Sequence, residues 1–289
     1  MPDWTTRSLL NWATQDFRTL GLGTPRLDAE LMLAHVLGVD RMRLYMDMDR
    51  PLAAAELASM RALVVRRRRR EPVAYLTGHR EFYLRDFNVS SAVLIPRPDT
   101  ETLIERAFQL LPADQPARVI DLCTGSGAIA VTLAAERPAV RIVATDISEA
   151  ALAVARGNAE KHSVIERVEL RLGDLFAALE PGSQYDLIVA NPPYVRDGEL
   201  PELAPELHHE PALALVAGDD GLAVLRRLAV ELAVWLAPGG VALLEIGAGQ
   251  AEAVLQLLAA NPELAELQAH SDLGGIQRVI ESHKRAEQE

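Results

Sequence analysis

The sequence has 289 residues, 49% of them hydrophobic, which is enough to bury one large domain or a large and a small one. The formal net charge of -12 argues against a protein whose whole surface binds the nucleic-acid backbone, because such binding rests on Lys and Arg. One cysteine, no secretory pattern at the start and no apolar stretch that could span a bilayer favour a cytoplasmic protein without a membrane partner.

The amino-terminal part, residues 1–80, predicts a small helical domain. Apolar residues recur at helical spacing between Thr5 and Leu20, which predicts a first helix. A second helix is expected to be capped by Thr24 and closed by Gly38. A third run, Leu52 to Arg70, is rich in good helix formers. The arginines that end this run predict a solvated face that stabilises the negative end of the helix.

The chain changes character after residue 80. Phe82–Leu84 and Asn88–Leu94 predict the extended segments of a linking hairpin over 81–98. Residues 99–289 predict an α/β domain, with a helix after Asp99 as its cap and then helical segments alternating with short apolar runs. Such alternation is typical of a mostly parallel sheet covered by helices. The predicted strands are Arg118–Leu122, Arg141–Asp146, Val168–Leu172, Tyr185–Ala190 and Val241–Ile246.

A glycine-containing turn follows the first of these strands and predicts a cofactor site. Gly125 and Gly127 lead directly into a helix, and glycine lets a ligand approach the backbone closely. Asp146 ends the next strand, where a carboxylate can accept hydrogen bonds from ribose hydroxyls. These features indicate an adenosine-containing cofactor, although the glycine spacing alone also fits NAD. Asp121 favours S-adenosylmethionine, because its carboxylate can meet an ammonium group and would repel a pyrophosphate.

Asn191, Pro192, Pro193 and Tyr194 stand directly after the fourth predicted strand and form the candidate catalytic motif. An amide nitrogen is a poor nucleophile because its lone pair is delocalised into the carbonyl. The Asn191 side-chain oxygen and the Pro192 backbone oxygen could accept both amide hydrogens and orient the nitrogen. The prolines would hold these acceptors rigid, and the ring of Tyr194 can pack on the flat amide. If S-adenosylmethionine donates its methyl group to this amide nitrogen, we expect no strong general base, because the methylated nitrogen loses its extra proton easily.

The sequence resembles the protein-(glutamine-N5) methyltransferases that modify class-I peptide chain release factors, and the resemblance covers nearly the whole chain. The order of several blocks is highly specific. These blocks are Arg69–Gly78, Leu94–Glu101, Asp121–Ala130, Asn191–Tyr194, His209–Pro211 and Gly218–Leu222.

The resemblance implies a helical domain that helps hold the release factor, followed by a seven-stranded Rossmann-like domain that binds S-adenosylmethionine. It implies the glutamine of a Gly-Gly-Gln loop as the target of Asn191–Tyr194. Asn191 is also expected at the cofactor, and either Leu175 or Phe176 is expected to contact the adenine. The other cofactor residues that it implies are Cys123, Thr124, Gly125, Ser126, Gly127, Asp146 and Asp174.

Three alternatives remain open from the sequence. A sister family methylates a glutamine of a large-subunit ribosomal protein, although the Pro96–Glu101 block favours the release-factor branch. Nucleic-acid amino-methyltransferases share Asn-Pro-Pro-aromatic motifs, but an acidic chain with a helical partner domain argues against them. The third alternative is a non-catalytic scaffold. We expect a monomer that needs no nucleic acid for its activity. We also expect no metal site, since His208 and His209 lack companion ligands at suitable spacing.

Overall fold

The computed structural model of the chain describes residues 4–286, and the chain divides into two compact units. The first unit comprises the chain up to His79 together with the separate segment Ala204–His209. The second unit comprises Arg80–Leu203 and the chain from Glu210 onward. The first unit is therefore discontinuous in sequence, because a short segment inserted far downstream belongs to it.

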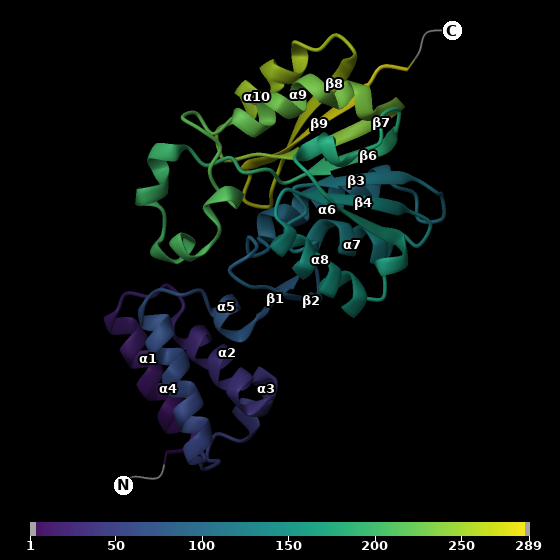
Figure 1. Ribbon diagram of the computed structural model, residues 1–289. Coiled ribbons are helices and arrows are strands. Elements are labelled where there is room, and N and C mark those ends of the chain that lie inside the picture. The colour runs from purple at the N-terminus through teal and green to yellow at the C-terminus, as the bar shows by residue number, and fades with distance from the viewer. Residues whose placement is uncertain (1–3, 287–289) are drawn as a thin grey trace. The chain divides into compact units, whose positions relative to one another are not determined.

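The first unit is all helical (Figure 1). The predicted helices are confirmed to within a few residues, whereas α3 is a short helix that apolar spacing does not predict. Thr24 makes no side-chain capping hydrogen bond at the start of α2, and its hydroxyl donates to the Asp28 carboxylate at 2.7 Å. Phe17, Met32 and other apolar side chains fill a separate core. The helices are α1 (Thr6–Thr19), α2 (Pro25–Leu37), α3 (Arg41–Met46), α4 (Ala54–Arg68), α5 (Val73–Thr77) and the 3₁₀ turn Pro205–His209.

The arginines at the end of α4 form the predicted solvated face only in part: Arg66, Arg68 and Arg69 are exposed, whereas Arg67 is buried. Arg67 is only 5% exposed; its Nε lies 2.9 Å from Oδ2 of Asp28 and its Nη2 lies 3.1 Å from Oε1 of Glu206. Neighbouring arginines pair within the same unit: Arg66 with Glu71, Arg68 with Asp16 and Arg70 with Glu206. Most of this positive charge is therefore used inside the helical unit, since acidic side chains far apart in sequence converge on it.

A hairpin follows the helices, but its strands are β1 (His79–Phe82) and β2 (Arg85–Asn88). The predicted extended segments are wrong in position. Tyr83 and Leu84 form the turn, with left-handed φ angles of 47° and 59°, as two-residue hairpin turns require. Large side chains rarely adopt this conformation, so the pattern of residue types conceals the turn. The residues after Asn88 are irregular rather than extended strand.

A seven-stranded sheet organises the second unit, in the order β5-β4-β3-β6-β7-β9-β8. All neighbouring strands are parallel except that β9 runs antiparallel to both β7 and β8. The predicted α/β fold and four of its strands are confirmed, β7 begins earlier than predicted, and β8 and β9 are not individually predicted. The strands are β3 (Arg118–Leu122), β4 (Arg141–Asp146), β5 (Val168–Leu172), β6 (Tyr185–Ala190), β7 (Leu236–Glu245), β8 (Leu264–Ser271) and β9 (Gln277–Lys284).

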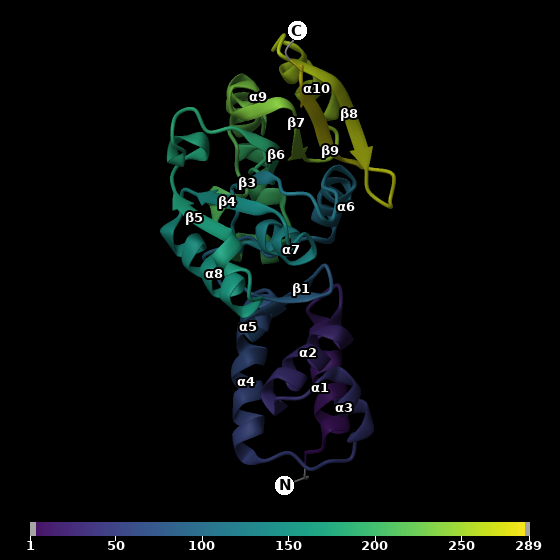
Figure 2. The same cartoon turned by 90° about the vertical axis from the view of Figure 1, so that its right-hand side faces the viewer.

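Helices cover both faces of the sheet, and β5 and β8 lie at its opposite ends (Figures 1 and 2). Helices α6, α7 and α8 pack in sequence on one face, and α9 and α10 pack together on the other. The bounds of the helices are α6 (Glu101–Leu110), α7 (Ala128–Glu136), α8 (Glu149–Lys161), α9 (Ala223–Trp235) and α10 (Ala251–Ala259), with 3₁₀ turns at Pro98–Thr100, Ile165–Arg167, Leu175–Ala178, Asp197–Glu202 and Ala212–Ala214. No helix between residues 4 and 286 is long and apolar enough to cross a membrane.

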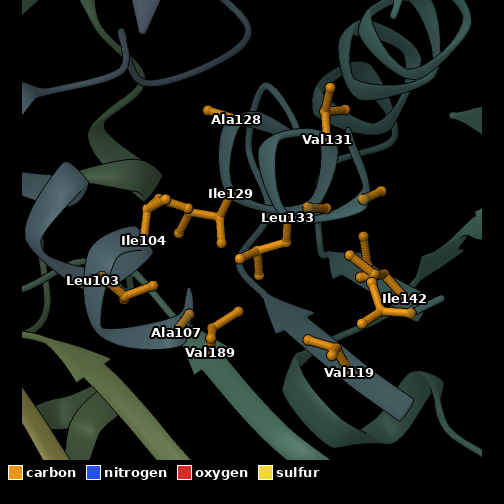
Figure 3. Close-up of a cluster of buried hydrophobic side chains, with 14 of the residues drawn as sticks. Leu103, Ile104, Ala107, Val119, Ala128, Ile129, Val131, Leu133, Ile142 and Val189 are labelled. Atoms are coloured by element: carbon orange, nitrogen blue, oxygen red, sulfur yellow. The ribbon is translucent and has the colours of Figure 1, made fainter. Parts of the chain in front are cut away.

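Each central strand contributes side chains to two hydrophobic cores, one on each face of the sheet. In β3, Val119 packs in the core beneath α6 and α7, where it is drawn with Ile104 and Leu133 (Figure 3). The next residue, Ile120, packs in the opposite core with α9 and α10. Successive side chains of a strand point to opposite faces, so a strand covered on both faces is apolar at most positions, with the buried Asp121 an exception in β3. This requirement produces the continuous apolar runs in the sequence.

The order of the strands also fixes the position of a ligand crevice. From β3 the chain proceeds outward through β4 and β5, then returns to place β6 on the other side of β3. In open sheets of this kind, ligands bind beyond the carboxyl ends of the strands at the point where the order reverses. That point lies between β3 and β6, so the loops after these two strands share one crevice.

Candidate active site

A cavity of about 250 Å³ lies at this crevice. Loops after β3, β4, β5 and β6 contribute to its wall. The predicted site residues that line it are Cys123, Thr124, Gly125, Ser126, Asp146, Asp174, Leu175, Asn191 and Pro193. The predicted residues outside its lining are Asp121, Gly127, Phe176, Pro192 and Tyr194. The structure thus brings the glycine turn, the β4 carboxylate and the Asn-Pro-Pro-Tyr motif to one cavity.

The glycine turn is fixed by backbone conformation and by packing. Gly125 and Gly127 have left-handed φ angles of 56° and 78°. A Cβ at Gly127 would stand 3.1 Å from the Cβ of Ala155 on α8, which is tighter than ordinary contact. Glycine is therefore required there for two reasons, its φ angle and the close approach of α8. Cys123 also adopts a left-handed φ of 58°, and burial raises the pKa of its thiol.

Asp146 ties the glycine turn to the end of β4. Its Oδ2 accepts a hydrogen bond from the Gly125 amide at 2.9 Å, and its Oδ1 accepts one from the Ser148 amide at 2.9 Å. Burial raises the pKa of Asp146, and these backbone hydrogen bonds act in the opposite direction. The carboxylate lines the cavity with its orientation already set by the backbone.

Asp121 lies behind the glycine turn. It is fully buried, and its Oδ2 accepts hydrogen bonds from the Thr124 hydroxyl at 2.6 Å and the Ala130 amide at 3.2 Å. Its Oδ1 is buried with no hydrogen-bond partner among residues 4–286. Burial raises the pKa of Asp121 to about 7. A buried carboxyl oxygen without a donor is energetically costly, because a buried polar group normally needs a hydrogen-bond partner.

In the segment after β5, the neighbouring apolar residues Leu175 and Phe176 have different surroundings. Leu175 lines the cavity and has a left-handed φ of 52°. Phe176 instead stacks on Trp235, with ring centroids 5.5 Å apart and planes inclined by 6°, inside the apolar core. Asp174 forms an ion pair with Arg227 at 2.9 Å, and both side chains line the cavity. Leu175 is thus the member of the pair that a ligand in the cavity can reach.

The Asn-Pro-Pro-Tyr motif is held from several sides. The Asn191 amide nitrogen donates to the Thr100 hydroxyl at 3.2 Å. The Tyr194 amide donates to the Leu215 carbonyl at 3.1 Å, and the Gln250 side chain donates to the Tyr194 carbonyl at 3.0 Å. Burial raises the pKa of the Tyr194 phenol to about 12, so the ring stays neutral. These contacts hold the motif in place, and its residues Asn191 and Pro193 form part of the cavity wall.

Two further segments line the cavity but are not predicted to do so. They are Ala92–Arg97 without Ile95, and Pro211–Ala214 without Ala212. Glu210 joins them, since its Oε2 accepts a hydrogen bond from the Ile95 amide at 3.0 Å and its other oxygen pairs with Arg97. Both segments overlap sequence blocks that carry the family resemblance, so this resemblance could have predicted them as cavity residues. The predicted cap Asp99 is wrong, because it lies within the 3₁₀ turn Pro98–Thr100 and Thr100 takes the N-cap position of α6. The Asp99 carboxylate pairs with Arg278 at 2.9 Å. In the described part of the chain, no three His, Cys, Asp or Glu side chains gather as a metal site.

Two family descriptions match the chain, "PrmC N-terminal domain" over residues 8–78 and "Methyltransferase small domain" over residues 100–227. A solved methyltransferase from Pyrococcus furiosus has the same fold, with a TM-score of 0.53 and 16% identity over 79% of this chain and 99% of that one. Fold, cavity and matched domain define an S-adenosylmethionine-dependent methyltransferase, and S-adenosylmethionine is its cofactor.

Comparison with curated relatives identifies the family within this class of methyltransferases. A release factor glutamine methyltransferase of Geobacter sulfurreducens is 42% identical over 279 residues, which is 96% of either chain. One from Koribacter versatilis is 43% identical over 262 residues, covering 90% of this chain and 92% of the relative. The chain belongs to the release factor glutamine methyltransferase family.

Proposed function

We propose that this protein transfers a methyl group from S-adenosylmethionine to the side-chain amide nitrogen of the glutamine in the Gly-Gly-Gln loop of class-I peptide chain release factors. The observation that carries the proposal is the position of Asn191, which lines the same cavity as the glycine turn and Asp146. Membership of the release factor glutamine methyltransferase family supports the choice of substrate.

The Asn-Pro-Pro-Tyr motif would activate the substrate by orienting it. S-adenosylmethionine supplies an electrophilic methyl group when bound. The Asn191 side-chain oxygen and the Pro192 carbonyl would accept the two hydrogens of the substrate amide, which localises the nitrogen lone pair and supports positive charge as it develops. Pro193 lines the cavity beside Asn191, and Tyr194 is proposed to pack on the amide plane. We propose that the reaction uses no strong base, because the methylated nitrogen loses its extra proton easily.

The remaining predicted residues would hold the cofactor. Asp146 would accept hydrogen bonds from the ribose and Leu175 would contact the adenine, since both line the cavity, whereas Phe176 stacks on Trp235 in the core. The unpartnered oxygen of Asp121 would receive the ammonium group. Cys123, Thr124, Gly125, Ser126, Gly127 and Asp174 would shape the rest of the binding surface, with Gly127 acting through the packing of α8.

The helical domain, residues 1–80 as expected from the sequence, is proposed to hold the release factor, and 81–98 to link it to the catalytic domain at 99–289. Use of the arginine run in internal ion pairs supports a protein partner over nucleic acid for this domain. We further propose a cytoplasmic monomer that needs no nucleic acid for the reaction.

Cofactor binding is expected to strengthen as the pH rises from 5.5 to 7. Asp121 must be ionised to meet an ammonium group, but burial raises its pKa to about 7, so the free protein holds a proton there at lower pH. Binding would release this proton, and the affinity would change by at most about tenfold per pH unit. Titration calorimetry of S-adenosylhomocysteine in two buffers of different ionisation enthalpy measures the release. Asp121→Asn should bind more weakly and release no proton; equal release by both proteins would contradict the role.

The proposed function is tested by incubating the full chain with methyl-labelled S-adenosylmethionine and a full-length release factor, then locating the label by peptide mass spectrometry. Label on the Gly-Gly-Gln glutamine is the expected result. Parallel reactions contain a large-subunit ribosomal protein and duplex DNA. Label on either of these alone would overturn the substrate, and no label on any substrate would overturn the activity.

A further inference from the structure

Glu245 is a buried acidic residue for which the proposed function has no use. It ends β7 and is only 1% exposed. Its Oε2 is buried without a hydrogen-bond partner, and no Lys, Arg or His of residues 4–286 forms an ion pair with it. A buried carboxyl without an ion-pair partner is destabilising, so it needs a compensating function or contact.

Glu245 lies beside the catalytic motif, because Leu244 of β7 pairs with Ala190 of β6 and the next residues are Glu245 and Asn191. Burial raises the pKa of Glu245 to about 7, and the side chains of Thr100 and Asn191 act against this rise. Thr100 is itself 4% exposed, and its hydroxyl accepts a hydrogen bond from the Asn191 amide nitrogen at 3.2 Å. A hydroxyl has one proton to donate, so when it accepts from Asn191 it can donate that proton to the Glu245 carboxylate. Such a donation would complete a directed chain of hydrogen bonds from Asn191 through Thr100 to Glu245.

This direction matters for an asparagine that must act as an acceptor. The oxygen and nitrogen ends of its side chain have nearly the same size, so packing alone does not choose between them. A reversed amide would present N–H donors to the N–H groups of the substrate and could not bind them. Acceptors placed behind Asn191 remove this ambiguity, because they hold its nitrogen inward and turn its oxygen toward the cavity.

We propose that Thr100 and Glu245 are positioning residues that fix the orientation of the Asn191 amide, so that its oxygen faces the substrate. The proposal rests on the proposed function and deepens it. Thr100 and Asn191 line the cavity, whereas Glu245 does not. Glu245 therefore acts through its neighbours and does not itself receive a proton from the substrate.

The test compares Thr100→Val, which removes the hydroxyl at nearly constant shape, with Thr100→Ser, which keeps it. In the full chain with a full-length release factor, Thr100→Val should lower kcat by about tenfold or more, with KM and S-adenosylhomocysteine affinity within about threefold. Thr100→Ser should retain most of the kcat. Equal kcat in the two variants, or a loss of cofactor affinity as large as the loss of kcat, would overturn the proposal.

A second measurement does not depend on activity. In the ¹⁵N-labelled protein, the side-chain amide signals of Asn191, identified by their loss in Asn191→Asp, should exchange slowly with water. The side-chain amide hydrogens of Asn191 should exchange faster with water in Thr100→Val and also in Glu245→Gln. The second variant provides the measurement if Thr100→Val does not fold. Unchanged exchange in the folded variants would overturn the positioning role even if the release factor is methylated. Conversely, absence of methylation by the wild type with altered exchange in the variants would reject the substrate alone.

Discussion

Asn191→Ala is expected to lower kcat for release-factor methylation by about 100-fold to 1000-fold, the range found when a preorganised polar group is removed from a site that stabilises developing charge. The side-chain oxygen is one of only two acceptors proposed for the substrate amide. Its loss leaves the nitrogen lone pair delocalised and the amide free to rotate. Single-turnover rates with labelled cofactor measure the chemical step directly.

Two controls separate catalysis from folding. S-adenosylhomocysteine should still bind to Asn191→Ala, because Asp146 and the glycine turn remain in place. Asn261→Ala is a matched substitution outside the cavity, where the amide nitrogen lies 3.5 Å from the Ala229 carbonyl, and it should leave kcat unchanged. Methylation by Asn191→Ala at the wild-type rate would reject the assigned role.

Arg67→Met is expected to destabilise the helical unit by about 3–5 kcal/mol, as removal of one partner from a buried ion pair commonly does. Arg67 contacts both Asp28 and Glu206, and Arg67 and Asp28 are almost completely buried. The substitution would leave the Asp28 carboxylate buried without its cationic partner. Urea unfolding followed by circular dichroism measures the change in free energy of unfolding.

The same run of arginines provides the matched control. Arg66 pairs with Glu71, but its side chain is 46% exposed. Exposed pairs contribute little, so Arg66→Met should change the free energy of unfolding by no more than about 1 kcal/mol. A loss for Arg67→Met no larger than that for Arg66→Met would show that burial of the ion pair has no special role.

The sequence predicts elements well where one physical requirement dominates. Strands β3 to β6 are covered by helices, and their apolar runs locate them correctly. Strand β9 is not predicted by its apolar pattern because it buries Glu281, which forms an ion pair with Arg106 and contacts His270 and His283, and only the fold brings these residues together. The hairpin is misplaced by the residue pattern because Tyr83 and Leu84 occupy left-handed positions that usually attract Gly or Asn.

The candidate site divides in the same way. Glycine spacing and residues at strand ends are local signals, so the sequence alone assigns Gly125, Asp146 and Asn191 to one crevice. The choice between Leu175 and Phe176 depends on which side chain stacks on Trp235, and this is a tertiary contact. Glu245 carries no sequence signal, since its environment is created by Thr100 and Asn191 from distant segments.

The discontinuity of the helical unit restricts how the protein can be divided. The chain passes from one unit to the other three times, after His79, Leu203 and His209. A fragment starting at Arg80 would retain Ala204–His209 but lose Arg67, which pairs with Glu206. Expression of the methyltransferase unit alone would therefore require a short linker in place of that segment. Genetic exchange of the helical unit between relatives would likewise have to transfer two separate pieces of sequence together.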